Sequence, residues 1–214
     1  RRVLGEEVIP HGEKVFSIFE EHTEWISKGK AGVSQELGLK VCVMQDQYGF
    51  ILHHQVMQNE TDDKVAIPIV RESKRRFTNL NSCSFDKGFY TPTNRRDLTE
   101  YLDNVIMPKK GRLSYADRAI EHSEEFLKAR RKHSIVESSI NALENHGLDR
   151  CLDHGLKGFK RYVALAVVAR NIQILGNTLQ QKEIKRQKRI EKLRQTRLSK
   201  MQYDISRIIY SSYR

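Results

Sequence analysis

Two apolar runs on either side of a short polar turn place the strongest constraint on the fold of this chain. Leu37 to Met44 and Phe50 to Met57 are joined by Gln-Asp-Gln-Tyr-Gly at 45–49. Apolar runs that flank a short turn with glycine are typical of a β-hairpin. The sequence therefore predicts an antiparallel hairpin over 37–57. An extended segment over 15–26 and a basic turn at 28–32 are predicted before it.

The segments after the hairpin alternate between helix and strand patterns. An acidic pair at 62–63 opens a helical segment, and Pro68 inside it predicts a kink or a helix that begins there. Short strands are predicted at 80–85 and 104–107, with a helix entered at Thr91 between them. Strand-helix-strand units favour parallel pairing, whereas the hairpin is antiparallel. We therefore expect an α/β layer fold with a mixed sheet flanked by helices.

The second half of the chain has helical composition. Ser114 and Asp117 are spaced as in a capping box, and the helical pattern continues until Gly147. Residues 159–175 form the most apolar segment, so we expect a buried helix that Gly176 caps.

Positive charge is concentrated near the C-terminal end. The 214 residues carry a formal net charge of +11, and residues 182–200 hold nine basic residues against two acidic ones. Apolar residues recur within this stretch, which predicts an amphipathic helix with a cationic face. Such a face can contact nucleic acid, an acidic membrane surface or only solvent. We favour the phosphate backbone, because the rest of the chain is also mildly basic.

Other classes of protein are excluded by composition. No stretch approaches the ~18 apolar residues of a membrane span, and no signal-peptide pattern opens the chain. These features indicate a soluble, intracellular protein. The three cysteines are widely spaced and odd in number, which favours reduced thiols over a disulfide framework.

Asp86 is the first candidate functional residue. It directly follows the strand predicted at 80–85, with Phe85 in the core and Gly88 allowing a close turn. Polar groups that perform chemistry gather at such strand ends, where the backbone leaves the sheet. A turn cap is the ordinary alternative for an aspartate at this position.

Glu137 is the second candidate. If 130–150 is helical, His133, Glu137 and Glu144 share one stripe, and Glu137 borders the apolar face beside Val136. A carboxylate at such a margin is costly unless it is paired or binds a metal. An ordinary surface ion pair is the alternative.

Several blocks, taken in their order along the chain, resemble one known family. The blocks are 14–32, 37–63, 84–89 (Ser-Phe-Asp-Lys-Gly-Phe), 107–114, 130–151 and 158–176. Over residues 1–176 the chain resembles the C-terminal part of a bacterial insertion-sequence transposase of the DDE type. The resemblance divides the chain into a partial catalytic domain at 1–176 and a basic helical tail at 177–214.

The resemblance implies a ribonuclease H-like fold in which three acidic residues hold two divalent metal ions, Mg²⁺ or Mn²⁺. Asp86 matches the second acid and Glu137 the third. Two such ions activate the attacking water or 3′-hydroxyl and neutralise charge on the phosphorus. The implied partners are element-end and target DNA and further copies of the chain, and the implied location is the bacterial cytoplasm, at the nucleoid.

The chain departs from the family pattern around Glu137. Related elements often carry Tyr-x2-Arg-x3-Glu-x6-Lys there, but positions 130, 133 and 144 are Arg, His and Glu. The phosphate-binding roles of the signature Arg and Lys therefore do not transfer. The basic residues that we expect to contact DNA are Lys87, Arg130, Lys132, Lys185, Arg186, Lys188, Arg189, Lys192 and Arg194.

The first acid of the family pattern has no clear match. Such proteins carry it on a strand that would precede Arg1, so we expect a truncated chain that binds DNA without turnover. Glu20 and Asp46 are the nearby acids within the chain. Two other functions remain open at this point: another ribonuclease H-like nuclease, or a non-catalytic basic protein that binds RNA or DNA.

Overall fold

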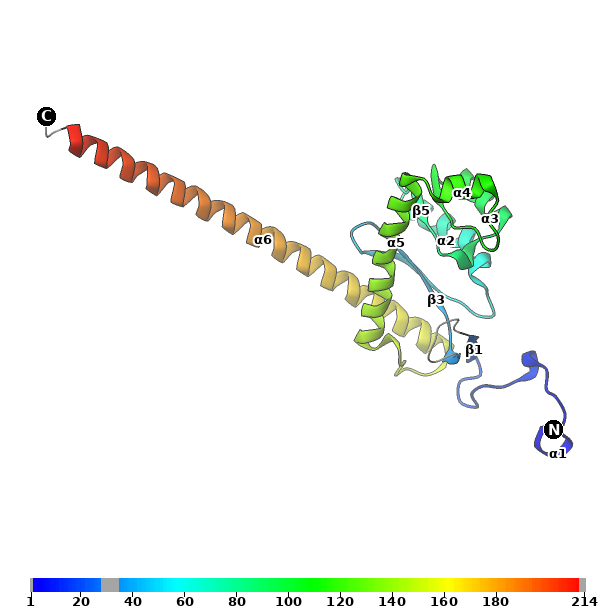
Figure 1. Cartoon of the computed structure of the whole chain (residues 1–214). Coiled ribbons are helices and arrows are strands. Elements are labelled where there is room, and N and C mark those ends of the chain that lie inside the picture. Colours follow the sequence, from blue (N-terminus) through cyan, green and yellow to red (C-terminus); the bar gives the residue numbers. More distant parts are fainter. Residues whose placement is uncertain (1, 28–34, 212–214) are drawn as a thin grey trace. The chain divides into compact units, whose positions relative to one another are not determined.

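The computed structural model describes residues 2–27 and 35–211 (Figure 1). The basic turn predicted at 28–32 lies outside the described residues. The chain divides into two compact units, Arg1–Arg170 and Asn171–Arg214. The helical elements are α1 (Arg2–Gly5), η1 (His11–Glu13), α2 (Asp62–Arg76), η2 (Lys87–Phe89), α3 (Pro92–Asp97), η3 (Leu98–Glu100), α4 (Tyr115–Glu121), α5 (Glu124–Leu143), η4 (Glu144–Leu148) and α6 (Gly155–Ser211).

The described strands form three sheets of two strands each. They are β1 (Glu24–Ser27) with β2 (Gln35–Gly38), β3 (Val41–Gln45) with β4 (Ile51–Val56), and β5 (Ser82–Ser84) with β6 (Asn104–Ile106). The first two pairs are antiparallel and the third is parallel. Both predicted kinds of pairing therefore occur, but in separate sheets instead of one mixed sheet.

The predicted hairpin is β3 with β4. Its turn is closed by Asp46, whose carboxylate accepts hydrogen bonds from the Tyr48 and Phe50 N–H groups at 2.8 and 2.9 Å. The apolar run predicted over 37–44 is divided between two sheets, because Leu37 pairs with Trp25 of β1. Only the last residues of the segment predicted to be extended over 15–26 form a strand, which is β1.

The main core forms where α2 packs on the β3–β4 hairpin and on η2. Val65, Ala66, Ile69 and Val70 recur at helical spacing and are buried. The predicted alternative in which the helix begins at Pro68 is wrong, because α2 begins at Asp62. Pro68 lies on the exposed face, where water can satisfy the carbonyl that its missing N–H leaves free.

Capping side chains set the helix starts in the middle of the chain. Thr91 accepts a hydrogen bond from the Asn94 N–H at 3.0 Å, and Ser114 and Asp117 form the predicted capping box. The helix predicted from Ser114 onwards is two helices. Ser123 interrupts it by capping α5, because its hydroxyl accepts the Phe126 N–H.

The long helix α6 differs from prediction in two ways. It continues through Gly176, which therefore does not cap it. Its apolar segment buries one face only: Val163 and Val167 are 0% and 6% exposed, but Leu165 and Ile172 are 62% and 64% exposed. The predicted fully buried helix is thus wrong. No helix among the described residues is long and apolar enough to cross a membrane.

Candidate functional site

Asp86 lies where the chain leaves β5. Phe85 continues the ladder, since its N–H donates to the Ile106 carbonyl at 2.8 Å, and its side chain is only 6% exposed. The next residue opens the 3₁₀ turn η2, and the Asp86 side chain is 72% exposed. The predicted position of this acid, at the end of a strand and outside the core, is confirmed.

Gly88 allows the turn after Asp86 to approach helix α2. A Cβ atom at this position would overlap the Asp62 carboxylate. Asp62 opens α2 and lies 3.9 Å from the Lys40 ammonium. Glycine therefore leaves room for the Asp62 carboxylate beside η2, and a larger side chain here would displace that carboxylate.

Helix α5 packs against both strands of the parallel pair (Figure 1). Phe126, Ser139 and Leu143 form its buried positions. His133 lies on the part of α5 that meets the end of β5, and its side chain is 19% exposed. The helix that carries Glu137 is thus held against the strand that carries Asp86.

The imidazole of His133 contacts two residues of the β5 segment. Its Nδ1 atom is 3.0 Å from the Ser84 Oγ, and its Nε2 atom is 3.6 Å from the Asp86 Oδ1. Ser84 and Asp86 are two residues apart in extended chain, so their side chains point to the same side while Phe85 points into the core. Both side chains therefore face α5.

Glu137 follows His133 by four residues on α5 and is exposed. Residues four apart on a helix share a face, so the contact between Asp86 and His133 lies one helical turn before Glu137. Within the part of the chain that the structure describes, the Glu137 carboxylate makes no hydrogen bond or ion pair. The ordinary surface pair considered for this residue is therefore not found there.

The described residues contain no assembled group of three or more His, Cys, Asp or Glu side chains that could hold a metal ion. Asp86 and Glu137 nevertheless offer the oxygen donors that Mg²⁺ and Mn²⁺ prefer. The two side chains therefore carry donor atoms that suit a divalent cation, although they do not form a closed cluster of ligands.

The basic residues predicted near the site differ in position. Lys87 is exposed next to Asp86, and Arg130 and Lys132 are exposed on α5. Arg130 precedes His133 by three residues and so shares its face and that of Glu137, whereas Lys132 is displaced by more than a quarter turn. Of the two basic residues of α5 that we expect to contact DNA, Arg130 is therefore the one that shares the face of Glu137.

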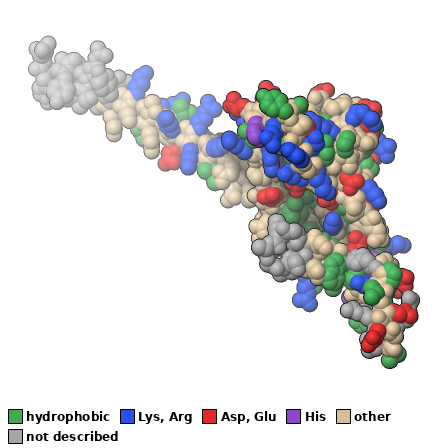
Figure 2. All heavy atoms as spheres, turned by 45° about the vertical axis from the view of Figure 1, so that its right-hand side comes forward, with side chains coloured by type: hydrophobic (Ala, Val, Ile, Leu, Met, Phe, Trp, Pro, Cys, Tyr) green, Lys and Arg blue, Asp and Glu red, His purple; other side chains and the backbone are tan. Residues whose placement is uncertain are grey.

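The basic stretch at 182–200 lies within α6, as the predicted cationic helix requires, and its Lys and Arg side chains are exposed. Figure 2 shows them spaced along the described part of this helix, with few acidic side chains. Lys182, Lys185, Arg189 and Lys192 recur at intervals of three and four and share one face. Lys200, 18 residues after Lys182, extends this face, and Arg186, Lys188 and Arg197 flank it.

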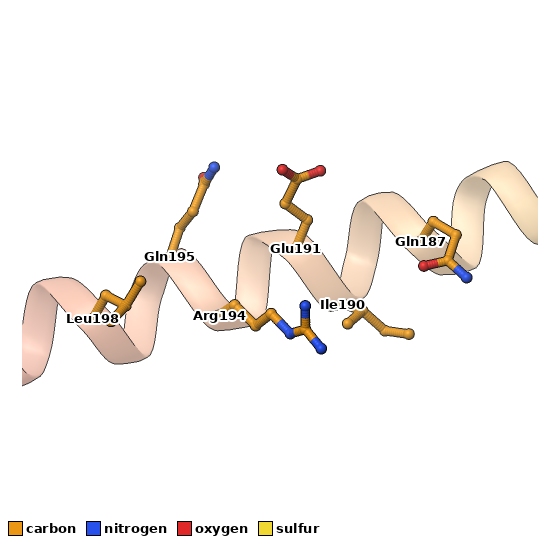
Figure 3. Close-up of a pocket in the computed structure, with 6 residues that line it drawn as sticks. All are labelled: Gln187, Ile190, Glu191, Arg194, Gln195 and Leu198. Carbon is orange, nitrogen blue, oxygen red and sulfur yellow. The ribbon is translucent and has the colours of Figure 1, made fainter.

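Arg194 lies apart from that face. Figure 3 shows it projecting on the same side of α6 as Ile190, whereas Glu191 and Gln195 project on the other. The hollow in this view is lined by six residues of one helix, so it is a shallow feature of the helix surface. A second hollow, of about 170 Å³, lies beside β6 and includes neither Asp86 nor Glu137.

Glu20 and Asp46, the two acids considered for the missing position, both have structural contacts. The Glu20 carboxylate accepts the Gly155 N–H at 3.0 Å and lies 3.2 Å from the His154 Nδ1, so it caps the start of α6. Asp46 closes the β3–β4 turn. Both carboxylates are thus engaged away from β5.

Ser84 was not singled out from the sequence. The signal that could have found it is its spacing of two from Asp86, which puts both side chains on one side of a strand whose other side is buried. Cys42, Cys83 and Cys151 are free thiols. Burial raises the pKa of Cys42 to about 12, so this thiol stays protonated and unreactive at neutral pH.

Comparison with known protein families gives one result that bears on this site. The family model described as "Transposase DDE domain" matches residues 10–172, which include β5, η2 and α5. Searches of curated proteins and of solved structures gave no match to this chain.

Proposed function

Since the chain belongs to the family of proteins with a transposase DDE domain, we propose that it binds the DNA of a mobile element and serves metal-dependent cleavage and joining of DNA strands. DDE transposase domains in general use divalent metals. The observation that carries the proposal is the 3.6 Å approach of Asp86 to His133, which brings the end of β5 to the helix that bears Glu137.

In this proposal Asp86 and Glu137 are the metal-binding carboxylates. A bound divalent cation would activate the attacking hydroxyl and neutralise charge that develops on the phosphorus. The protein's own contribution is to position the segments that carry the carboxylates: η2 packs on α2, and α5 packs on β5 and β6. Glu137 lies one helical turn after His133, the residue that Asp86 approaches.

The basic residues supply the phosphate contacts. Lys87 directly follows Asp86, Arg130 shares the face of α5 that bears Glu137, and Lys132 adds charge to the same helix. On α6 the face with Lys185 and Arg189 would follow a phosphate backbone. Such contacts position DNA without specifying its sequence, so retention of DNA and chemistry on it are separable properties.

A ribonuclease H-like arrangement belongs to the same proposal. It is supported by the parallel β5–β6 pair with an acid at the end of β5 and α5 packed on both strands. We also propose that the protein works at the bacterial nucleoid and that several copies assemble on the element ends.

The second candidate function is a non-catalytic protein that binds DNA or RNA. It is favoured by the local excess of seven positive charges over residues 182–200. This function needs neither Asp86 nor Glu137, so metal binding distinguishes it from the first.

The test is calorimetric titration of Mg²⁺ and Mn²⁺ into the protein and into its Asp86→Asn and Glu137→Gln variants. We expect each substitution to weaken binding of at least one cation tenfold or more, with DNA retention in a gel-shift assay unchanged. The control variants are Asp103→Asn and Glu100→Gln, which remove exposed carboxylates elsewhere. If both site variants bind the cations like the unmodified protein, the metal site is refuted and the non-catalytic function is favoured.

A further inference from the structure

Helix α6 carries a second apolar face besides the one that packs on the core. Val163 and Val167 are buried on one side of the helix. The apolar side chains on the other side are between 48% and 64% exposed, and we call these five residues the α6 stripe: Leu165, Val168, Ile172, Leu175 and Leu179. A continuous apolar surface of this kind marks a contact with another molecule more often than a face that only water covers.

The α6 stripe has the spacing of a seam between two helices. Its residues recur at intervals of three, four, three and four. They therefore lie within about 80° of one another around a helix of 3.6 residues per turn, over a length of about 20 Å. This is the spacing at which the side chains of one helix pack into the gaps of another.

Charge is sparse around the stripe, although the chain as a whole is rich in it. Charged residues make up 30% of the sequence, but Arg170 is the only one from Tyr162 to Gln181, and it lies on the side of α6 opposite the stripe. The residues that border the stripe are small or neutral: Ala164, Ala169, Asn171, Gly176 and Thr178. Nothing along this seam would therefore repel an identical seam or hold it at a distance.

We propose that the α6 stripe is the contact between two copies of this chain, whose α6 helices pair antiparallel along it. A second copy fits because it presents the same neutral, apolar seam. The inference rests on the proposed function in one respect, since it names the surface by which several copies assemble. The metal-binding residues play no part in it.

The charge that follows the stripe selects the antiparallel orientation. Residues 182–200 carry seven more positive than negative charges. Parallel helices, with axes about 8–10 Å apart, would lay this stretch beside its own copy within about one Debye length in 0.1 M salt, so the repulsion would be only partly screened. Antiparallel helices send the two basic stretches to opposite ends of the stripe. Val168 then lies level with Leu179 of the other copy, and Ile172 with Leu175.

The length of the stripe sets the strength of the contact. A standard protein interface buries roughly 800 Å² on each partner, and a stripe of five side chains is no larger than that. We therefore expect a dissociation constant on the order of 10 μM, with dimers in concentrated solution and monomers in dilute solution. Substitutions in the stripe should weaken pairing and leave the stability of the dilute monomer nearly unchanged.

Sedimentation velocity of the full chain from about 1 to 200 μM, which brackets the expected dissociation constant, tests the pairing. We expect the sedimentation coefficient to rise with concentration from the monomer value to the dimer value. Ile172→Lys puts a charge in the centre of the stripe and should weaken pairing tenfold or more, and Leu175→Gln should weaken it without adding charge. The matched control is Asn177→Lys, which adds the same charge at an exposed position on the other side of α6 and should pair like the unmodified protein.

Cysteine cross-linking tests the orientation. A Cys151→Ser background removes a native thiol that is partly exposed. In this background a mixture of the Val168→Cys and Leu179→Cys proteins should form a mixed disulfide on mild oxidation, whereas neither protein should cross-link with itself. Cross-linking of Leu179→Cys with its own copy would show parallel helices and overturn the antiparallel contact.

Two results of sedimentation would overturn the inference. One is a protein that stays monomeric up to about 200 μM, well above the expected dissociation constant. The other is a dimer that both Ile172→Lys and Leu175→Gln leave intact, with circular dichroism verifying that each variant is folded. The metal site fails separately: unchanged cation binding in Asp86→Asn and Glu137→Gln refutes that site whether or not the chain forms dimers.

Discussion

The two units of the chain differ in what their side chains do. In Arg1–Arg170 apolar residues such as Val65 and Leu98 are fully buried, and capping and ion pairs join separate elements. In Asn171–Arg214 the apolar Leu179 and Leu193 are 56% and 57% exposed, and most of the charged side chains are basic and exposed. The comparison teaches that the buried core and the candidate metal-binding residues belong to the first unit, whereas the second carries the positive charge on which the proposed DNA contacts depend.

The largest expected effect comes from removing charge in the second unit. Changing Lys182, Lys185, Arg186, Arg189 and Lys192 together to Gln should reduce DNA affinity at least a hundredfold near 0.1 M salt. It should also reduce the slope of log K against log salt by up to about 4.5, because each phosphate contact contributes about 0.9. Fluorescence anisotropy over a salt series measures both quantities.

The matched control changes neutral residues of the same helix, Gln181, Gln187 and Gln195, to Ala. It should keep both the affinity and the salt slope. If the charge variant binds DNA as the control does, the second unit is not the electrostatic partner of DNA, and the contrast between the units is lost.

The next effect concerns the core of the first unit. Leu98→Ala should lower the free energy of unfolding by about 3 kcal/mol, because it removes a side chain with 0% exposure and leaves a cavity. Leu179→Ala, in the second unit, should change it by less than about 0.5 kcal/mol. Urea unfolding followed by tryptophan fluorescence compares them, and equal losses would show that Leu179 is buried against a partner in solution.

The sequence predicted the elements that depend on local chemistry. The capping residues Thr91 and Ser114, the acidic start of α2 and the burial of Phe85 beside an exposed Asp86 all follow from one short stretch each. Each effect acts within a few residues and therefore leaves a local pattern.

The features that were not predicted depend on competition with distant parts. Gly176 was expected to end a helix, but one glycine costs only about 1 kcal/mol in a helix interior and strong helix formers follow it. Leu37 was assigned to the hairpin, but its partner is Trp25 of another sheet. The Ser84–His133 contact joins residues 49 positions apart, which no local pattern encodes.

A smaller effect comes from the ion pairs that join elements of the first unit. The Asp117 carboxylate lies between the Lys109 ammonium and the Ser114 hydroxyl, and these hydrogen bonds hold its pKa well below the usual range. A depressed pKa stabilises the fold above the unfolded value of about 4, and this stability is lost as the pH falls through the folded value. The melting temperature should therefore fall less in Asp117→Asn than in the unmodified protein between pH 5 and pH 2.

Glu124→Gln is the control for this experiment. Its carboxylate is 82% exposed and pairs with Lys128 of the same helix, so it joins no separate elements. We expect its melting temperature to follow that of the unmodified protein. A loss of stability in acid that is identical in all three proteins would contradict the assigned role of Asp117.

The smallest effects come from two glycines, one in each unit, for which the same substitution should act in opposite directions. Gly176 lies inside α6 with no atom within 4 Å of an added Cβ, so Gly176→Ala should stabilise the helix by up to about 1 kcal/mol. Gly147 has φ +102° and its carbonyl accepts the Tyr162 hydroxyl at 3.1 Å. Gly147→Ala should destabilise the first unit by about 1 kcal/mol or more, because alanine is strained at this φ. Helicity measured at 222 nm should rise for Gly176→Ala, and the melting temperature should fall for Gly147→Ala. If both substitutions stabilised the protein, or both destabilised it, the proposed contrast between the two units would be contradicted.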